Sequence, residues 1–387
     1  MSSNVLVLGF GGVGVLYAYL AGAGGAHVTA ACRSNYDVVR EHGVTVNSAK
    51  VGSHPNWRPA HVVKSAEQVQ TGFDYILCTF KLTPELGPAS DVVRPYLESA
   101  VQRESGKLPL VVMIQNGIDM EEEMYASLVN IEKPLARGIV SGLAWVGTTL
   151  LDNGTRIEHG KFEKLQLGFY PLPSRVRPDE DAQRMLDNLV NVLSCGGSTV
   201  IKSDDIEALR WSKLLWNISW GGVCLTSRQP VIEILRPEAM PYTCGVARRL
   251  MCELILVARA NGIDEHRLPT SIIDDVFDLT QSQSPAIFVN PADPSISARE
   301  PTHLLPDDFK PSILVDLERG RPMELEPIFG NLVARARRVG VDTPHLDTVL
   351  ASIKPIQAQI IAALGRTASS EYFVNPRVNA TAGAPVI

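Results

Sequence analysis

The six cysteines of this chain form no Cys-x-x-Cys pair, and no stretch has the spacing of a zinc or iron–sulfur site. The sequence therefore predicts no bound metal. Most of the cysteines have apolar neighbours, which indicates reduced thiols in a core and a reducing, cytoplasmic compartment. The six are Cys32, Cys78, Cys195, Cys224, Cys244 and Cys252.

Long basic runs are also missing, and the formal net charge at pH 7 is −6. Because phosphate neutralisation needs clustered Lys and Arg, nucleic acid is not an expected partner. Hydrophobic residues make up 45% of the chain and charged residues 20%, which is typical of a soluble globular protein with an ample core. A length of 387 residues suits two domains.

Charged residues are absent from residues 4–24, NVLVLGFGGVGVLYAYLAGAG, which raises the question of a membrane segment. A signal peptide has a basic stretch before its apolar core, and here only Met, Ser, Ser and Asn precede the apolar residues, which begin at Val5. A spanning helix needs about 20 mostly large apolar residues, whereas this run is rich in glycine, which weakens helices. We therefore expect no membrane partner.

The same residues fit a strand that leads into a phosphate-binding turn. Val5–Leu8 has the aliphatic character of a buried parallel strand, and a G-x-G-x-x-G motif follows it. In such motifs the glycines allow a tight turn, close approach of a pyrophosphate and close helix packing, while the helix N-terminus faces the anion. Val15–Ala23 can form that helix. The predicted cofactor-binding residues here are Gly9, Phe10, Gly11, Gly12, Val13 and Gly14.

Alternating strand-like and helix-like stretches predict an α/β fold, with an N-terminal Rossmann-type doubly wound sheet and a C-terminal all-helical domain. Later parallel strands are expected at Val28–Cys32, Tyr75–Thr79 and Leu110–Ile114. Residues 138–168, with turn signals at Asp152–Gly154, indicate antiparallel strands that extend the sheet.

The character of the sequence becomes helical from Ser203 onward, where Ser203 or Asp204 is a candidate N-cap. We predict a nucleotide-binding domain over residues 1–202 and a helical substrate domain over 203–366. Residues 281–308 are expected to form a long surface loop, and 367–387 a disordered tail.

Arg33 indicates which nicotinamide nucleotide the fold would bind. An acidic residue about 20 positions after the glycines would bind the ribose 2′-OH of NAD, but this chain has Arg33-Ser34-Asn35 after its second strand. A guanidinium there can pair with the 2′-phosphate of NADP. NADP (NADPH) is therefore preferred over NAD, with a solvated loop cation as the alternative for Arg33. FAD would require further nucleotide-binding sequence, which we do not find.

Three further clusters accompany the glycine motif: CTFK at 78–81, IQNG at 114–117, and the pair RWSKLLWN at 210–217 and KPSILVDLERGRPMELEPIFG at 310–330. With these motifs in this order, residues 4–365 resemble the ketopantoate reductase (2-dehydropantoate 2-reductase) family. The resemblance implies an NADPH-binding Rossmann domain, a helical second domain, and reduction of a 2-keto acid to a 2-hydroxy acid.

Lys213 is the candidate catalytic acid. Ketone reduction needs a hydride on carbon, a proton on oxygen and a cation near the developing alkoxide, and an ammonium can provide the last two. Asn217, four residues later, would lie on the same helix face. The resemblance implies that Lys213 is the general acid and that Asn217 binds substrate. A surface lysine on an amphipathic helix is the alternative.

The resemblance implies roles for four more residues. Glu324 would be a second catalytic residue that contacts the substrate hydroxyl or the lysine, and Ser312 would contact the substrate carboxylate. Asn116 would bind both the nicotinamide ribose and the substrate region, and Lys81 would lie near the cofactor. Without the resemblance, Glu324 fits a first-turn glutamate and Ser312 an N-cap. Asn116 then fits a turn, and Lys81 a loop cation. Glu326 is expected to be solvated.

One departure from the family bears on the substrate. The bacterial enzymes have a second substrate-contacting asparagine four residues after the first, where this chain has Gly221. Trp216 and Trp220 lie nearby in the sequence, so we expect a more apolar pocket. Such a pocket would favour a branched 2-keto acid such as 2-ketoisovalerate over ketopantoate.

Two other functions stay open at this point. A related imine or β-hydroxy acid dehydrogenase would have the same layout without the late Ser…Glu segment, and a non-catalytic NADP-binding regulatory protein would need neither Lys213 nor Glu324. A helical second domain often provides a dimer surface, so a homodimer is a further possible partner.

Overall fold

The computed structural model describes residues 2–282 and 309–365. Nearly all of the loop expected at 281–308, and the whole tail expected at 367–387, lie outside the described residues. The chain divides into two compact units. The first contains residues up to Leu82 and Ala89–Arg210, and the second contains Thr83–Pro88 and the described residues from Trp211 onward.

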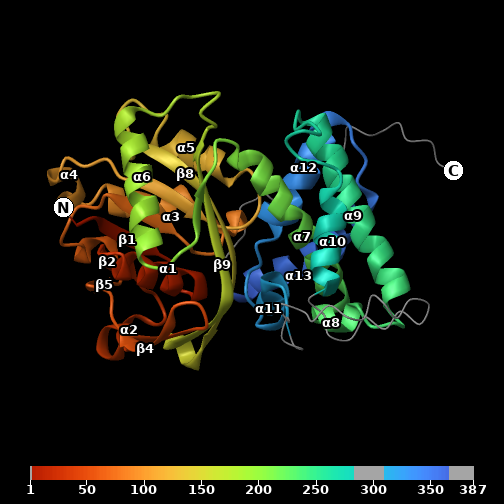
Figure 1. Ribbon diagram of the computed structural model, residues 1–387, viewed down its shortest axis with the longest axis horizontal. Helices are drawn as coiled ribbons and strands as arrows, with labels where there is room; N and C mark the ends of the chain where they lie inside the picture. The colour runs from red at the N-terminus through yellow and green to blue at the C-terminus, as the bar shows by residue number, and fades with distance from the viewer. Residues whose placement is uncertain (1, 283–308, 366–387) are drawn as a thin grey trace. The chain divides into compact units, whose positions relative to one another are not determined.

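The first unit is built on one ten-stranded sheet with the order β4-β3-β9-β8-β7-β6-β1-β2-β5, in which β10 pairs with β9 (Figure 1). The run β5-β2-β1-β6-β7-β8 is parallel throughout and has the strand order of a dinucleotide-binding fold. The strands are β1 (Asn4–Leu8), β2 (His27–Ala31), β3 (Val44–Ser48), β4 (Gly52–Trp57), β5 (His61–Val63), β6 (Tyr75–Cys78), β7 (Leu110–Ile114), β8 (Gly138–Leu151), β9 (Arg156–Tyr170) and β10 (Val200–Lys202).

Helices cover both faces of this sheet, as the doubly wound prediction requires. Strand β1 shows the alternation, because Val5 and Val7 pack in the core with α1 and α6 while Leu6 and Leu8 pack in the core with α3 and α5. The helical segments of the first unit are α1 (Gly12–Ala23), α2 (Tyr36–His42), η1 (Ala66–Gln68), α3 (Ser90–Leu97), α4 (Ala100–Glu104), α5 (Met120–Leu128), η3 (Asp152–Gly154) and α6 (Glu180–Cys195).

Strands β8 and β9 form the antiparallel extension that the sequence predicts. They are joined at the turn Asp152–Gly154, and Leu151 pairs with Arg156 directly beside it. The predicted parallel strands are also present, within one residue of their expected bounds. The prediction of an α/β first domain followed by a helical region is confirmed.

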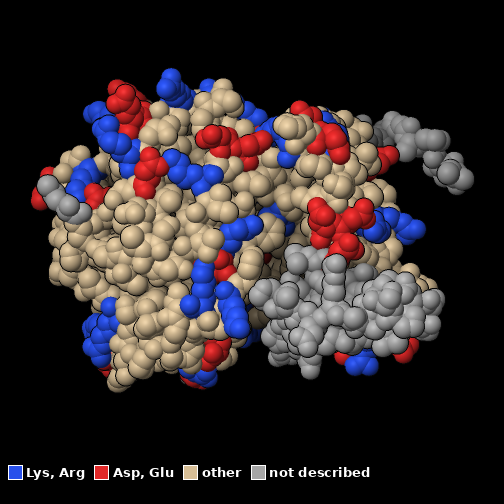
Figure 2. Space-filling view, viewed as in Figure 1, with Lys and Arg blue, Asp and Glu red and all other residues tan. Residues whose placement is uncertain are grey.

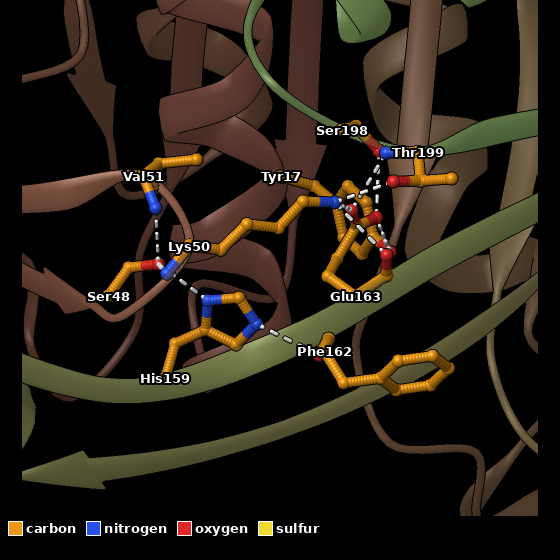
Figure 3. A network of polar contacts seen from close by, with 9 residues as sticks. All are labelled: Tyr17, Ser48, Lys50, Val51, His159, Phe162, Glu163, Ser198 and Thr199. Atoms are coloured by element: carbon orange, nitrogen blue, oxygen red, sulfur yellow. Dashed lines mark hydrogen bonds and ion pairs between the residues drawn. The ribbon is translucent and has the colours of Figure 1, made fainter. Parts of the chain in front are cut away.

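The buried carboxylate of Glu163 links α1 to strand β9 (Figure 3). Glu163 on β9 accepts hydrogen bonds from the hydroxyls of Tyr17 on α1 (3.0 Å) and Ser198 (2.7 Å), and its other oxygen lies 2.6 Å from the ammonium of Lys50. Burial beside this carboxylate raises the pKa of Tyr17. Because every partner of Glu163 is a donor, its charge is compensated inside the core.

The second unit is helical, and its longest helix begins in the first. Helix α7 spans Ile206–Ser227, so the division after Arg210 falls within it. The separate prediction of a domain boundary at 202/203 stays a prediction. The other helical segments are η2 (Pro84–Leu86), α8 (Val231–Ile234), α9 (Met240–Ala260), α10 (Ile272–Ser282), α11 (Ser312–Glu318), the π-helical turn η5 (Glu326–Gly330), α12 (Asn331–Val339) and α13 (Pro344–Ala363).

The N-cap of α7 differs from the sequence prediction. Asp205, and neither Ser203 nor Asp204, accepts the hydrogen bond from the amide of Ala208 (3.2 Å). The reason is that Ser203 still donates its amide to Leu167 of β9 (2.8 Å), so the backbone remains paired to the sheet there.

Charged side chains on the face of the first unit drawn in Figure 2 are of both signs and interspersed. Among the residues that the structure describes, no helix is both long and apolar enough to cross a bilayer. Within the same residues, no three His, Cys, Asp or Glu side chains are grouped so that they could hold a metal ion.

Candidate active site

The glycine turn after β1 is shaped by close backbone contacts. Gly9 has φ +97°, and a Cβ there would lie 2.4 Å from the amide nitrogen of Phe80. The hydroxyl of Thr79 donates to the carbonyl of Gly9 (2.7 Å). A Cβ on Gly14 would lie 2.0 Å from that same carbonyl. Both positions therefore require glycine for the fold itself.

Gly11 is different, because a Cβ built on it would meet no atom within 4 Å. It is the N-cap of α1, which has no side-chain cap and no acidic residue in its first turn. Open space at a helix N-terminus with uncompensated N–H groups suits a pyrophosphate. The turn therefore fits the dinucleotide that the motif implies.

Asn35 supports this turn and was missed in the sequence analysis. The residue is 9% exposed, and its side-chain amide donates to the carbonyl of Phe10 at 3.1 Å. The sequence signal was present, since Asn35 closes the Arg-Ser-Asn stretch after the second strand. Its contact with the glycine turn depends on β1 and β2 pairing in parallel, so that both end at one edge.

Arg33 is exposed and follows β2, the position at which this fold would bind the 2′-phosphate of NADP. Its carbonyl accepts a hydrogen bond from the amide of Tyr36 (3.3 Å), and the Tyr36 ring has two more cations beside it. The ammonium of Lys64 lies 5.7 Å from the ring centroid, and the guanidinium carbon of Arg40 lies 5.3 Å from it. Arg40 also forms an ion pair with Glu41 (3.4 Å), so Lys64 is the cation that adds to the positive charge of Arg33 at the end of β2, which suits a phosphate.

Lys81 and Asn116 follow β6 and β7, which are parallel neighbours. Lys81 is exposed and Asn116 half-buried. The two loops are tied together by Gln115, whose amide donates to the carbonyl of Phe80 at 2.7 Å. The predicted cofactor residues of the first unit thus all follow the carboxyl ends of parallel strands, at the edge where open α/β sheets bind ligands.

Lys213 and Asn217 in the second unit lie on one face of α7. Both are partly exposed, whereas Leu214, Leu215 and Ile218 beside them are buried. The four-residue spacing on a continuous helix places the two side chains one turn apart. Their arrangement fits a lysine and an amide that act on one small molecule.

The segment that carries Ser312 lies beside this helix at Gly221. A Cβ on Gly221 would meet the Cβ of Pro311 at 4.0 Å and nothing closer. Pro311 is the N-cap of α11, and Ser312 is its exposed first residue rather than an N-cap. Trp216 donates its indole N–H to the hydroxyl of Thr280 (3.1 Å), so a hydrogen bond within this unit fixes its ring.

Glu324 is 4% exposed and directly precedes the helical turn at Leu325. Gln357 of α13 holds the backbone of the preceding residue, Met323, through both its amide and its carbonyl. The side-chain oxygen of Gln357 accepts from the amide of Met323 (3.0 Å), and its nitrogen donates to the Met323 carbonyl (3.0 Å). No local signal in the sequence connects residues 323 and 357, so this support could only be found in the structure.

Glu326 was expected to be solvated, and that expectation is wrong. Its side chain is 12% exposed and forms an ion pair with Lys354. Lys354 also approaches the buried Glu85 (3.4 Å), and burial lowers the pKa of Lys354 although Glu85 opposes the shift. Both partners of Lys354 are distant in sequence, so local pattern could not reveal the cluster.

Residues 5–171 match the ketopantoate reductase PanE/ApbA family, and residues 205–357 match the C-terminal domain of that family. The chain belongs to this family. Its members include NAD(P)-dependent 2-keto acid reductases. The ketopantoate reductase family thus accounts for both halves of the chain, and the resemblance seen in the sequence motifs is confirmed.

Three known proteins are similar to this chain, two in sequence and one in fold alone. The uncharacterized protein YDL144C of Saccharomyces cerevisiae is 28% identical over 378 residues, which cover 92% of this chain and 94% of that protein. The structure of 2-dehydropantoate 2-reductase from Methylococcus capsulatus superposes with a TM-score of 0.69 at 30% identity, covering 92% of this chain and 97% of that one. D-mandelate dehydrogenase with NADH and anilino(oxo)acetate shares the fold, with a TM-score of 0.69, 16% identity, and coverage of 92% and 99%.

Proposed function

We propose that the protein reduces a 2-keto acid to the 2-hydroxy acid with NADPH. The observation that carries the proposal is the open space at Gly11 on the uncapped N-terminus of α1, in a chain of the ketopantoate reductase family. When bound, the reduced nicotinamide supplies the hydride. The exposed Arg33, with Lys64 beside the neighbouring Tyr36, supports NADPH over NADH because these cations attract a 2′-phosphate.

The residues of the second unit bind the substrate and move the proton in this proposal. Lys213 donates a proton to the substrate oxygen and stabilises the negative charge that develops there. Asn217 binds the substrate, and Ser312 contacts its carboxylate. Glu324 interacts with Lys213 or the product hydroxyl. On the first unit, Asn116 binds the nicotinamide ribose and the substrate region, and Lys81 lies near the cofactor.

The substrate is proposed to be a branched 2-keto acid with an apolar side chain, such as 2-ketoisovalerate. Gly221 stands where the bacterial enzymes have an asparagine, and a side chain could start there without a clash. Glycine at this position therefore leaves room for an apolar substrate side chain. It also lacks the polar group that would form a hydrogen bond with a substrate hydroxyl. Gly221→Asn is expected to shift the ratio of kcat/KM values toward ketopantoate by about tenfold, because a hydrogen bond is gained.

The function is tested by following NADPH oxidation with a panel of 2-keto acids. We expect turnover with a branched 2-keto acid, and a loss of about 100-fold or more in kcat for Lys213→Ala, since a general acid is removed. Lys133→Ala, which changes an exposed lysine of the first unit, serves as the matched control and should leave kcat unchanged. Tight NADPH binding without turnover of any keto acid would favour a regulatory protein instead.

A further inference from the structure

Arg210 is a buried cation that the catalytic roles above do not use. Its side chain is 5% exposed, and one guanidinium nitrogen, Nη1, donates to the carbonyls of Gln115 (2.8 Å) and Gly117 (3.0 Å). These two carbonyls flank Asn116 in the sequence. One nitrogen atom therefore fixes the backbone on both sides of the residue proposed to bind the nicotinamide ribose.

The rest of the guanidinium is held just as firmly. Nε lies 2.6 Å from the carboxylate of Glu121 and 2.9 Å from the hydroxyl of Ser141, and Nη2 donates to the carbonyl of Gly142 (3.3 Å). Glu121 is itself buried and also accepts from Ser141 (2.7 Å). Burial lowers the pKa of Arg210, and the negative charge of Glu121 opposes that shift.

The turn at Asn116 depends on such support because its backbone is unusual. Gly117 has φ +98° and Asp119 has φ +68°, so the chain reverses through two left-handed residues between β7 and α5. The carbonyls of Gln115 and Gly117 belong to buried residues and would lose their charged donor without Arg210. Lysine cannot replace the planar fork that contacts three carbonyls and a carboxylate together.

We propose that Arg210 is a positioning residue that acts through Asn116. It joins the early part of α7 to the turn that presents Asn116, and Lys213 follows three residues later on the same helix. It does not itself contact cofactor or substrate. The proposal rests on the function proposed above, in which Asn116 binds the nicotinamide ribose.

The test is a double-mutant cycle with Arg210→Lys and Asn116→Ala. NADPH affinity is measured by nucleotide fluorescence, and kcat is measured with the best 2-keto acid of the panel. We expect each single variant to weaken NADPH binding about tenfold and the double variant to bind no more weakly than Asn116→Ala alone. The costs overlap because Arg210 acts only by placing Asn116.

Arg259→Lys is the matched control, since Arg259 also donates through Nη1 to two carbonyls, those of Ile263 (2.8 Å) and Asp264 (3.0 Å). It lies on α9 in the second unit, and no role in the reaction is proposed for it. We expect it to lower Tm, as Arg210→Lys does, while NADPH affinity and kcat stay within about twofold of wild type.

Fully additive effects of Arg210→Lys and Asn116→Ala, or unchanged NADPH affinity in Arg210→Lys, would overturn the proposal. If Arg210→Lys does not fold, Ser141→Ala replaces it in the cycle, because it removes one contact of Arg210 and leaves the cation paired. If the wild-type protein bound NADPH but reduced no keto acid, only the proposed function would be refuted. The coupling between Arg210→Lys and Asn116→Ala in NADPH affinity would still decide the role of Arg210.

Discussion

Gly11 and Gly14 lack a side chain for different physical reasons. At Gly14 the reason is internal, because the first carbon of any side chain would lie 2.0 Å from a carbonyl oxygen of the turn. At Gly11 the surrounding space is open, so the protein alone does not require glycine there. A substitution at Gly14 therefore tests the stability of the turn, whereas a substitution at Gly11 tests the binding of a ligand.

We expect Gly14→Ala to destabilise the protein by about 3 kcal/mol through overpacking, and to weaken NADPH binding as a consequence. Gly11→Ala should keep the wild-type Tm and yet weaken NADPH binding at least tenfold, since the methyl group would occupy the space in which we propose that the pyrophosphate binds. Thermal unfolding and fluorescence titration measure the two effects separately.

Gly245→Ala on α9 is the control for this pair, because a Cβ there also meets nothing within 4 Å. It should leave NADPH affinity unchanged and raise stability by about 0.5–1 kcal/mol, as alanine does within a helix. NADPH affinity unchanged in Gly11→Ala would contradict the assignment of the turn as a pyrophosphate site.

Strands β3 and β9 are joined by a histidine whose surroundings favour the neutral ring (Figure 3). The hydroxyl of Ser48 lies 2.8 Å from Nδ1 of His159, and it already accepts from the amides of Lys50 (3.1 Å) and Val51 (3.0 Å). The hydroxyl proton is therefore directed at an unprotonated Nδ1, and Nε2 can donate to the carbonyl of Phe162 (3.2 Å). Burial lowers the pKa of His159.

This pairing predicts a pH-dependent stability. The unfolded chain binds a proton at a higher pH than the folded protein, so stability from His159 is present above about pH 6.5 and is lost as the pH falls toward the lower pKa of the folded state. His159→Gln should reduce the decline of Tm below pH 6.5. The exposed His27, changed to Gln, is the control, and equal Tm profiles for the two variants would refute the expectation.

The chain enters the second unit twice. Residues Thr83–Pro88, directly after the loop that carries Lys81, belong to that unit although the chain then returns to the sheet through α3. Glu85 anchors the segment Thr83–Pro88 in the second unit. It is fully buried and accepts hydrogen bonds from Gln357 (3.2 Å) and Lys354 (3.4 Å) of α13. The second unit is therefore not formed by one continuous piece of sequence.

Glu85→Ala is expected to lower the free energy of unfolding by about 2 kcal/mol, because charge-assisted hydrogen bonds to buried groups are lost. Lys354 keeps its ion pair with Glu326, which limits the loss. Denaturant unfolding measures the effect, and Glu238→Ala at an exposed site of the same unit is the control. A loss no larger than that of the control would show that Glu85 does not anchor the segment.

The sequence by itself determined the features that depend on local pattern. The glycine motif between an apolar strand and a helix, the parallel strands, the antiparallel pair at the Asp152–Gly154 turn and the one-turn spacing of Lys213 and Asn217 all follow from residues close in the chain. Steric preference and hydrophobic periodicity act over a few residues, so a single sequence shows them directly.

Only the tertiary structure decided which distant groups support these features. Asn35 at the glycine turn, Gln357 behind Glu324, and Arg210 around Asn116 each depend on elements that pair or pack far apart in sequence. Glu326 was misjudged for the same reason, because its partner Lys354 comes from another helix. Burial and hydrogen-bond satisfaction are properties of the packed chain, and local residue type carries little information about them.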